Sequence, residues 1–452
     1  MATTPVQTTL TALELARAGR FAEIRDLFAP QLQAMVPPEA LKSAWDAELG
    51  RQGAVSSVGS PVSEPVHAGV VVVKVPVTCE RGGFALVASV SEQGQLGGLQ
   101  LAPPGAAEPI TPWEPPAYAD PDAFTELEVA LGSGDLAVPG TMTMPRGPGP
   151  HAGVVLLAGS GSLDRDETIG RNKPFKDIAW GLASFGIATL RFDKVTYAHA
   201  HEVKDADDFT LADEYLPDAT AAIKLLEQQP AVAGDRVFLL GHSLGGTVAP
   251  RVAAADPSVA GLIILAGGAQ PLHWVIVRQM RYLASLRPET EAATRPALDE
   301  LAEKARMVDS PDLSPSTPAS RLPLGAPASY WLDLRDYNPV EVAAIVGKPM
   351  LILQGGRDYQ VTVADDLSRW EAGLGDRPNV TVRVYPEHNH LFTPGSGPST
   401  PAEYEPAEHV DATVVADIAA WLATVPGWTY RTRRAVSATA TMLERIGRPS
   451  RS

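Results

Sequence analysis

The sequence of 452 residues lacks several features that mark particular classes of protein. It has one cysteine, Cys79, which excludes an internal disulfide framework and indicates a reducing compartment. No basic stretch followed by an apolar core opens the chain, so no signal peptide is visible. No apolar run approaches the roughly 20 residues that a membrane-spanning helix needs. We therefore expect a cytoplasmic protein without a membrane span.

Positive charge is also scarce. Lys and Arg number 37 against 53 Asp and Glu, which gives a net charge of −16, so no nucleic-acid-binding surface is expected. Hydrophobic residues make up 45% and charged residues 20%, as is typical of globular proteins. A chain of this length exceeds one ordinary domain, which predicts two or more.

Residues 1–104 carry the pattern of a small α+β domain. Apolar residues at helical spacing run from about Leu10 to Trp45, with a break at Pro37 and Pro38. Strand-like runs follow at residues 69–75, 83–90 and 95–101. Helices followed by antiparallel strands are typical of the α+β class.

The helix–strand order and the segment from Gly19 to Glu23 resemble an NTF2-like domain found in front of some bacterial hydrolases. No catalytic cluster is visible in this part of the chain. We therefore expect a packing or dimerisation module, through which copies of the chain could form a homo-oligomer.

Residues 105–123 contain repeated prolines, which exclude regular strand ladders and predict a linker. Strand-like segments then alternate with helical ones through residues 124–426. The expected strands are residues 124–131, 136–144, 154–157, 187–192, 237–240, 262–265, 350–354 and 380–385. The expected helices include residues 178–185, 214–228 and 410–422. This alternation predicts a mostly parallel, doubly wound sheet, with ligands at the carboxyl ends of its strands.

Two segments depart from the alternation. Residues 270–336 are helix-rich and then proline-rich, and we expect this insertion to form a cap over the strand ends. Its large aromatic residues are suited to roofing a pocket: Trp274, Tyr282, Tyr330 and Trp331. Residues 427–452 form a basic tail, with six arginines against the one glutamate Glu444, and a loosely docked tail is favoured over a binding segment.

The rest of the chain is organised around the pentapeptide from Gly241 to Gly245, which reads Gly-His-Ser-Leu-Gly. An apolar strand precedes it and a helical segment follows. A strand, a Gly-x-Ser-x-Gly and a helix make a nucleophile elbow, in which a strained turn exposes the serine hydroxyl. Side chains at the two glycine positions would clash with the neighbouring strand and helix. We therefore predict that Ser243 is a nucleophile.

A serine hydroxyl needs a base, and the base needs an orienting acid. Downstream of the elbow, Asp358 follows a strong strand and a glycine turn, and His388 and His390 follow the last strand. These are the positions, in the order Ser, Asp, His, that a hydrolase triad requires. We predict Ser243, Asp358 and His390 as the triad, with His388 as the alternative base.

Acyl transfer also needs hydrogen-bond donors for an oxyanion. The backbone N–H of Leu244, after the nucleophile, is one candidate. The second should come from the loop at residues 158–162, whose glycines let the backbone turn inward, and we choose Ser160. As a phosphate-binding loop this segment fails, because no Gly-Lys-Ser/Thr follows.

These residues resemble the α/β-hydrolases of the bacterial two-domain carboxylesterase kind, over about residues 124–426. The oxyanion loop of that kind runs into Asp-Arg-Asp-Glu, matched here at residues 164–167. Its Asn-Lys-Pro-Phe and Asp-Lys segments are matched at residues 172–175 and 193–194. Many relatives open the oxyanion loop with His-Gly, whereas this chain has Ala158 and Gly159. That departure leaves the backbone donor intact but puts the usual anchoring of the loop in question.

The resemblance implies an α/β-hydrolase with a helical cap, and a serine esterase acting on small-molecule esters of short acyl groups without a metal or organic cofactor. An acyl-peptide or dipeptidyl hydrolase and a thioesterase share the triad and stay open. Those peptidases usually carry a propeller, and no blade-length repeats occur here. From another class, a catalytically silent binding protein on the same scaffold also stays open.

Overall fold

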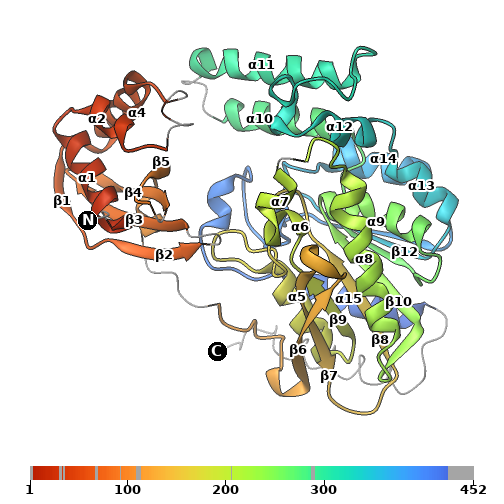
Figure 1. Cartoon of the computed structure of the whole chain (residues 1–452). Coiled ribbons are helices and arrows are strands. Elements are labelled where there is room, and N and C mark those ends of the chain that lie inside the picture. The colour runs from red at the N-terminus through yellow and green to blue at the C-terminus, as the bar shows by residue number, and fades with distance from the viewer. Residues whose placement is uncertain are drawn as a thin grey trace. The chain divides into compact units, whose positions relative to one another are not determined.

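The computed structural model describes residues 4–29, 33, 36–66, 70–91, 93–107, 113–204, 206–286 and 291–425. The chain divides into two compact units, Met1–Pro112 and Trp113–Ser452 (Figure 1). The predicted basic tail, and residues 108–112 of the predicted linker, lie outside the described residues. From Trp113 on, the proline-rich segment belongs to the second unit, where Trp113 Nε1 donates to Asp177 Oδ1 at 2.9 Å.

The first unit consists of helices packed on an antiparallel sheet. Its helices are α1 (Pro5–Arg17), α2 (Phe21–Asp26) and α4 (Pro38–Gln52). Its strands are β1 (Val55–Val58), β2 (Val62–Val66), β3 (Val70–Cys79), β4 (Gly82–Ser91) and β5 (Leu96–Ala102). Pro38 does not simply break a helix but starts α4, where its missing N–H costs nothing.

The core of this unit lies between the helices and β3, β4 and β5. Its fully buried side chains include Leu13, Ile24 and Phe84, and the rings of Trp45 and Phe84 meet edge to face at 5.6 Å. Cys79 is buried and unpaired. The unit therefore has an apolar core of its own.

The second unit contains a sheet in the order β13-β12-β11-β10-β8-β9-β7-β6. The strand bounds are β6 (Phe124–Leu131), β7 (Val138–Pro145), β8 (His151–Leu157), β9 (Ala188–Phe192), β10 (Val232–His242), β11 (Leu262–Leu265), β12 (Met350–Gly355) and β13 (Val380–Tyr385). Strand β7 runs antiparallel to β6 and β9, and the other neighbours are parallel. The expected mostly parallel sheet is confirmed.

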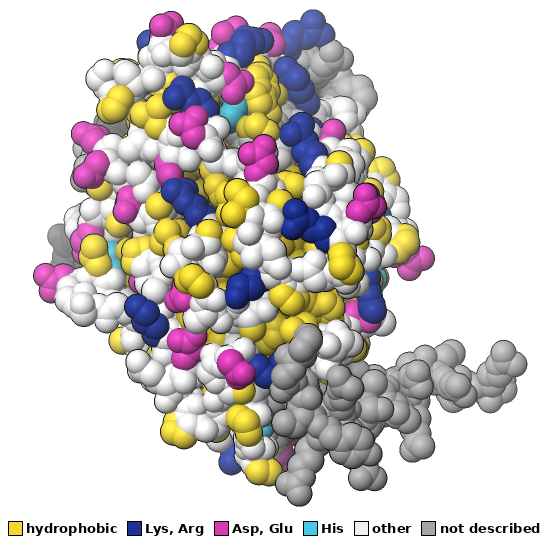
Figure 2. All heavy atoms as spheres, turned by 90° about the vertical axis from the view of Figure 1, so that its right-hand side faces the viewer, with side chains coloured by type: hydrophobic (Ala, Val, Ile, Leu, Met, Phe, Trp, Pro, Cys, Tyr) yellow, Lys and Arg dark blue, Asp and Glu magenta, His cyan; other side chains and the backbone are white. Residues whose placement is uncertain are grey.

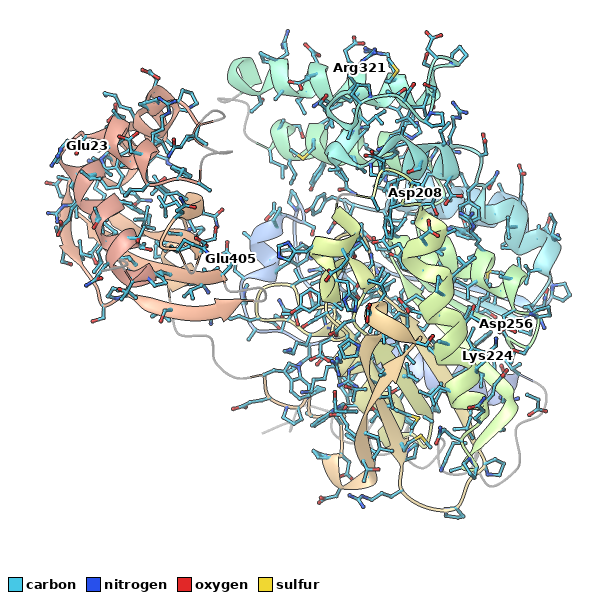
Figure 3. The ribbon with its side chains drawn as sticks, in the orientation of Figure 1. Glu23, Asp208, Lys224, Asp256, Arg321 and Glu405 are labelled. Atoms are coloured by element: carbon cyan, nitrogen blue, oxygen red, sulfur yellow. The ribbon has the colours of Figure 1, made fainter. Side chains whose placement is uncertain are left out.

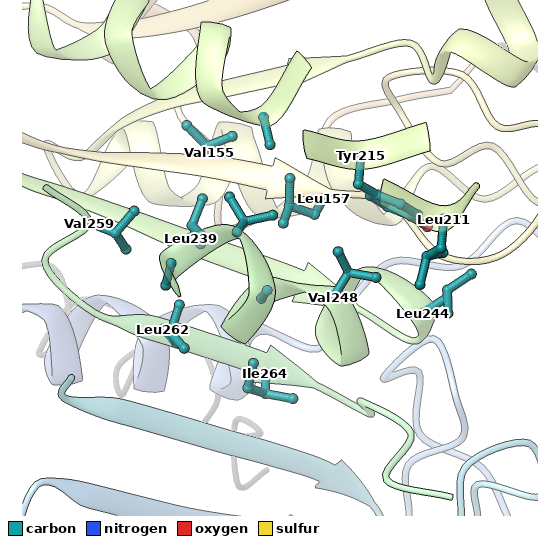
Figure 4. Close-up of a cluster of buried hydrophobic side chains, with 14 of the residues drawn as sticks. Val155, Leu157, Leu211, Tyr215, Leu239, Leu244, Val248, Val259, Leu262 and Ile264 are labelled. Atoms are coloured by element: carbon teal, nitrogen blue, oxygen red, sulfur yellow. The ribbon is translucent and has the colours of Figure 1, made fainter. Parts of the chain in front are cut away.

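Helices cover both faces of this sheet. On one face α8 (Leu211–Glu227) and α9 (Leu244–Ala255) bury Val155 and Leu239 (Figure 4). On the other, α5 (Pro174–Ser184) and α15 (Ala412–Thr424) bury Phe238 and Leu240. Because consecutive strand residues point to opposite faces, a sheet covered on both sides requires the continuous apolar runs seen in the sequence.

The insertion between β11 and β12 is helical. It holds α10 (Leu272–Ser285), α11 (Glu291–Asp309), α12 (Ala328–Arg335) and α13 (Pro339–Val346). Helix α12 packs against α8, and the loop with Asp208 before α8 lies beside the insertion (Figure 3). There Ser329 Oγ donates to the carbonyl of Asp207 at 3.0 Å. The insertion thus contacts α8 near the amino-terminal end of that helix.

Further α-helices in the described part of this unit are α6 (Val195–Ala198), α7 (Ala200–Lys204) and α14 (Ser368–Leu374). On the face of this unit that Figure 2 shows, Lys and Arg side chains are interspersed with Asp and Glu. The negative net charge is therefore not gathered into one acidic surface there. Among the described residues, no helix is long and apolar enough to cross a membrane.

Candidate active site

The predicted elbow is a tight turn between β10 and α9. Ser243 occupies it with φ 53° and ψ −119°, a strained backbone for a residue with a side chain. A Cβ on Gly241 would overlap the Gly245 carbonyl, and a Cβ on Gly245 would overlap the carbonyl of Leu157 at the end of β8. The steric requirement for both glycines is confirmed.

Asp358 and His390 come together beyond the ends of β12 and β13. The Asp358 Oδ2 atom lies 2.7 Å from His390 Nδ1, and both side chains are almost fully buried. A carboxylate accepts, so Nδ1 carries the hydrogen and Nε2 is left with a lone pair when the ring is neutral. This is the tautomer that a general base needs.

Several contacts fix the Asp358 carboxylate. Its Oδ1 accepts from the backbone N–H groups of Gln360 and Val361, at 2.8 and 2.9 Å, and its Oδ2 also accepts from Gln354 Nε2 at 3.1 Å. The turn before it needs glycine, because a Cβ on Gly355 would come within 2.5 Å of the Asn389 carbonyl oxygen. The glycine turn thus lets the Asp and His loops pack together.

The neighbouring histidine is engaged elsewhere. His388 Nε2 lies 3.4 Å from Asp411 Oδ2 at the start of α15, and the His388 ring lies against Tyr385 with centroids 5.2 Å apart. The structure pairs Asp358 with His390 and pairs His388 with Asp411.

Ser243, Ser160 and Leu244 line a common cavity of about 270 Å³. The rest of its wall comes from α9, the β11–α10 region, the α12–α13 segment, the loop after β12, and α14. These residues are Thr247, Gly268, Ala269, Gln270, Pro271, Leu272, Val275, Gln279, Leu334, Arg335, Asp336, Tyr337, Asn338, Pro339, Gln360, Val361 and Arg369. The insertion therefore forms part of the cavity wall.

Two backbone amides at this cavity are placed to donate. Leu244 is the first residue of α9, where an N–H has no acceptor within the helix. Ser160 lies in the loop after β8, and within the described chain neither amide donates to another residue. The cavity holds the serine, but among the described residues no hydrogen bond joins the Ser243 hydroxyl to His390. Such bonds are often long in unliganded enzymes and shorten when substrate binds.

A family model described as "Alpha/beta hydrolase family" matches residues 177–407. Esterase EstD of Thermotoga maritima is 34% identical to this chain over 393 residues, which are 87% of this chain and 89% of that protein. The chain belongs to the α/β-hydrolase family. The predicted fold class, a hydrolase sheet preceded by a small α+β region, is confirmed.

Two other similar proteins align with less of this chain or at lower sequence identity. The 2,6-dihydropseudooxynicotine hydrolase of Paenarthrobacter nicotinovorans is 29% identical over 139 residues, 31% of this chain and 34% of that protein. The solved structure of the Pyrococcus furiosus esterase PF2001 aligns with a TM-score of 0.39 and 18% identity, over 63% of this chain and 91% of that one.

Sequence reasoning assigned no role to two buried residues of this hydrolase. Glu167 has φ 53° and is 1% exposed, and its Oε1 lies 2.6 Å from the donating Gly159 N–H and 3.0 Å from His242 Nδ1. His242 Nε2 lies 2.9 Å from the His390 carbonyl. Burial alone would lower the pKa of His242, but the Glu167 carboxylate, the His390 carbonyl and the charge of Asp358 together outweigh it, so the pKa is raised. Both His242 nitrogens thus face acceptors, as an imidazolium requires.

This pair connects three parts of the site. Through Glu167 and His242, the loop at residues 158–162, the elbow and the His390 loop are tied by buried hydrogen bonds. The motif at residues 164–167 marks the carboxylate in the sequence, but its partners are set by the fold.

The expected aromatic roof is wrong. Among the residues that line the cavity in the described chain, none of the four aromatics chosen from residues 270–336 occurs. Trp331 is fully buried in the core, Trp274 Nε1 donates to Asp309 Oδ2 at 2.7 Å, and Tyr330 OH donates to Glu214 Oε2 at 2.9 Å. Tyr282 OH donates to the Ser399 carbonyl at 3.0 Å. Their rings serve packing, and the smaller Leu272 and Val275 reach the cavity.

Within the described residues, no three His, Cys, Asp or Glu side chains gather in a way that could hold a metal ion.

Proposed function

We propose that the chain is a carboxylesterase that hydrolyses small esters of short acyl groups through an acyl-enzyme on Ser243. The observation that supports this is the strained elbow at Ser243, which lines one cavity together with Leu244 and Ser160, whose backbone amides donate to no described residue. The hydrogen-bonded pair of His390 and Asp358 supports it further. The relative EstD, named as an esterase, supports the same reading.

In the proposed reaction His390 Nε2 takes the hydroxyl proton while Ser243 Oγ forms a bond to the ester carbonyl carbon. The carbonyl oxygen becomes an oxyanion, which the amides of Leu244 and Ser160 stabilise. The tetrahedral intermediate then expels the alcohol, which takes the proton from His390, and the acyl-enzyme is left. Water repeats the sequence, releasing a carboxylic acid and restoring the serine. Asp358 holds the tautomer of His390 and stabilises its imidazolium.

A panel of substrates tests this assignment against its alternatives. We expect turnover of p-nitrophenyl esters to be fastest for short acyl groups, with aminoacyl amides and acyl thioesters turned over at least tenfold more slowly. Faster turnover of aminoacyl amides would assign a peptidase, and faster turnover of thioesters a thioesterase. No turnover of any of the three would favour a silent binding protein.

Val275 should set the longest acyl group that the cavity accepts. It lines the cavity of about 270 Å³, which is small among ligand sites, so Val275→Ala should deepen it. We expect kcat/KM for octanoate relative to butyrate esters to rise about fivefold, measured on the p-nitrophenyl series.

The matched control lies two residues along the same helix. Val277 is buried against Ala302 and Ala305 and does not line the cavity, so Val277→Ala removes the same two methyl groups elsewhere. It should leave the octanoate-to-butyrate ratio unchanged within about twofold. An equal change in both variants would show that general loosening, and not cavity depth, sets the preference.

The first unit is proposed to be an NTF2-like packing or dimerisation module. Its own apolar core and its lack of an assigned reactive cluster support a role outside the chemistry.

A truncated chain that begins at Trp113 should keep at least half of the kcat on butyrate esters and should sediment as a monomer, in contrast to the full chain. A truncated chain that is folded by circular dichroism but inactive would place this unit in the active site. The cytoplasmic location of the protein stays a prediction.

A further inference from the structure

Buried side chains hold the oxyanion loop on both sides of Gly159. The Gly159 carbonyl accepts from Lys194 Nζ at 2.7 Å and lies 2.9 Å from the hydroxyl of Tyr215. The Gly159 N–H donates to Glu167 at 2.6 Å. All three side chains are at most 2% exposed. Water therefore has little access to replace these contacts.

The orientation of this carbonyl determines where the next amide points. In a trans peptide the C=O of one residue and the N–H of the next point in opposite directions. Because the Gly159 carbonyl faces Lys194 and Tyr215, the Ser160 N–H faces away from them. Ser160 lines the cavity that also holds Ser243.

Lys194 is itself held rigidly. Its ammonium donates to the Gly159 carbonyl and to Tyr215 OH, the latter at 3.0 Å, and forms an ion pair with Glu214 Oε1 at 2.8 Å. The other Glu214 oxygen accepts from Tyr330 OH of α12, at 2.9 Å. The cation is thus fixed by two helices as well as by the loop that it contacts.

The Tyr215 hydroxyl contacts two carbonyl groups of the same turn. Its hydroxyl lies 2.8 Å from the Ala158 carbonyl as well as 2.9 Å from that of Gly159. Burial, together with the charge of Glu214, raises the pKa of Tyr215 well above 10, so the phenol keeps its proton. The phenol can therefore donate its proton in a hydrogen bond to the turn.

We propose that Lys194 is a positioning residue for the oxyanion site, which together with Tyr215 holds the Gly159 carbonyl so that the Ser160 N–H faces the substrate oxygen. This role rests on the proposed esterase function. Lys194 does not touch substrate and acts through the peptide plane. The effect of Lys194 is greatest in the transition state, where the substrate's carbonyl oxygen carries most negative charge.

Lys194→Met should lower kcat about 100-fold on butyrate esters and change KM less than threefold, because misplacement by about 1 Å costs a donor most of its effect. Phenylboronic acid, which forms a tetrahedral adduct on a serine hydroxyl, should bind more weakly in the same proportion as kcat/KM falls. Tyr215→Phe should lower kcat about fivefold by the same route.

Arg236→Met is the matched control, since it also removes a buried cation that donates to backbone carbonyls, those of Leu422 and Val425. Its kcat and boronate affinity should stay within threefold of the wild type, whatever happens to its melting temperature. Equal losses of kcat in Lys194→Met and Arg236→Met, or a boronate affinity that does not fall with kcat/KM, would overturn the positioning role.

If Lys194→Met does not fold, Tyr215→Phe decides, and its full activity would overturn the proposal. The experiment distinguishes a failure of this role for Lys194 from a failure of the proposed esterase function. A wild-type chain that neither hydrolyses esters nor binds the boronate contradicts the esterase, and with it this role. An active wild type with a fully active Lys194→Met contradicts the role alone.

Discussion

Ser243→Ala should reduce ester turnover by on the order of 10⁵-fold and abolish labelling by a fluorophosphonate. The elbow exposes one hydroxyl at the cavity, so the wild-type chain should take up one equivalent of the probe, found on the peptide that contains Ser243. Intact mass and peptide mapping measure the labelling. The remaining turnover would come from the oxyanion donors alone.

The control is Ser258→Ala, which removes a surface serine hydroxyl that donates to Asp256 Oδ1 at 2.6 Å. It should be labelled once and should turn over butyrate esters at the wild-type rate. Retained turnover in Ser243→Ala would remove the proposed mechanism, and labelling of another residue in the wild type would move the nucleophile.

The sequence predicted the second unit well because its signals are local. Buried parallel strands require short apolar runs, and β11 has the predicted bounds. The two edge strands of the sheet, β6 and β13, also have the predicted bounds. In the first unit β1 and β2 were missed, since their short runs mix valine with serine, glutamate and Pro65 and show no apolar run. Pairing with β3, which is long and apolar, is what makes them strands.

In the candidate site too, the residues with a local sequence signal were predicted and those positioned by distant contacts were not. Ser243 and Asp358 each follow a strand in a glycine-marked turn, and His390 follows the last strand, so the chain order and the parallel sheet were enough to expect Asp358 and His390 together. The lining of the cavity was not predictable, because it depends on how α10 is rotated over the sheet. That rotation turns Val275 toward the cavity and Trp274 toward Asp309.

The anchoring of the oxyanion loop depends on contacts between distant segments. Ala158 replaces the histidine of many relatives, which left the support of the loop in question. In the structure Lys194, Tyr215 and Glu167 hold the loop, and Lys194 lies 35 positions from the glycine that it contacts. The sequence contains these residues within motifs, but their spacing does not reveal that the side chains converge on one peptide.

His390→Ala should lower kcat by about 10⁴-fold or more, because no other group near Ser243 is expected to take its proton. Asp358→Asn should be impaired to a similar order while staying folded, since an amide can hold the imidazole in the wrong tautomer. Steady-state kinetics on butyrate esters, with circular dichroism to check the fold, measure both. These losses follow from the 2.7 Å pair that the two side chains form.

His388→Ala is the matched control, since it removes the same ring two positions away. His388 contacts Asp411 and Tyr385 rather than Asp358, so its loss should cost about tenfold or less. Because triad members act as a unit, the double variant Ser243→Ala/His390→Ala should be scarcely slower than either single variant. An inactive His388→Ala beside a working His390→Ala would transfer the base to His388. Additive losses in the double variant would instead show that the serine and the imidazole act independently, against a common proton transfer.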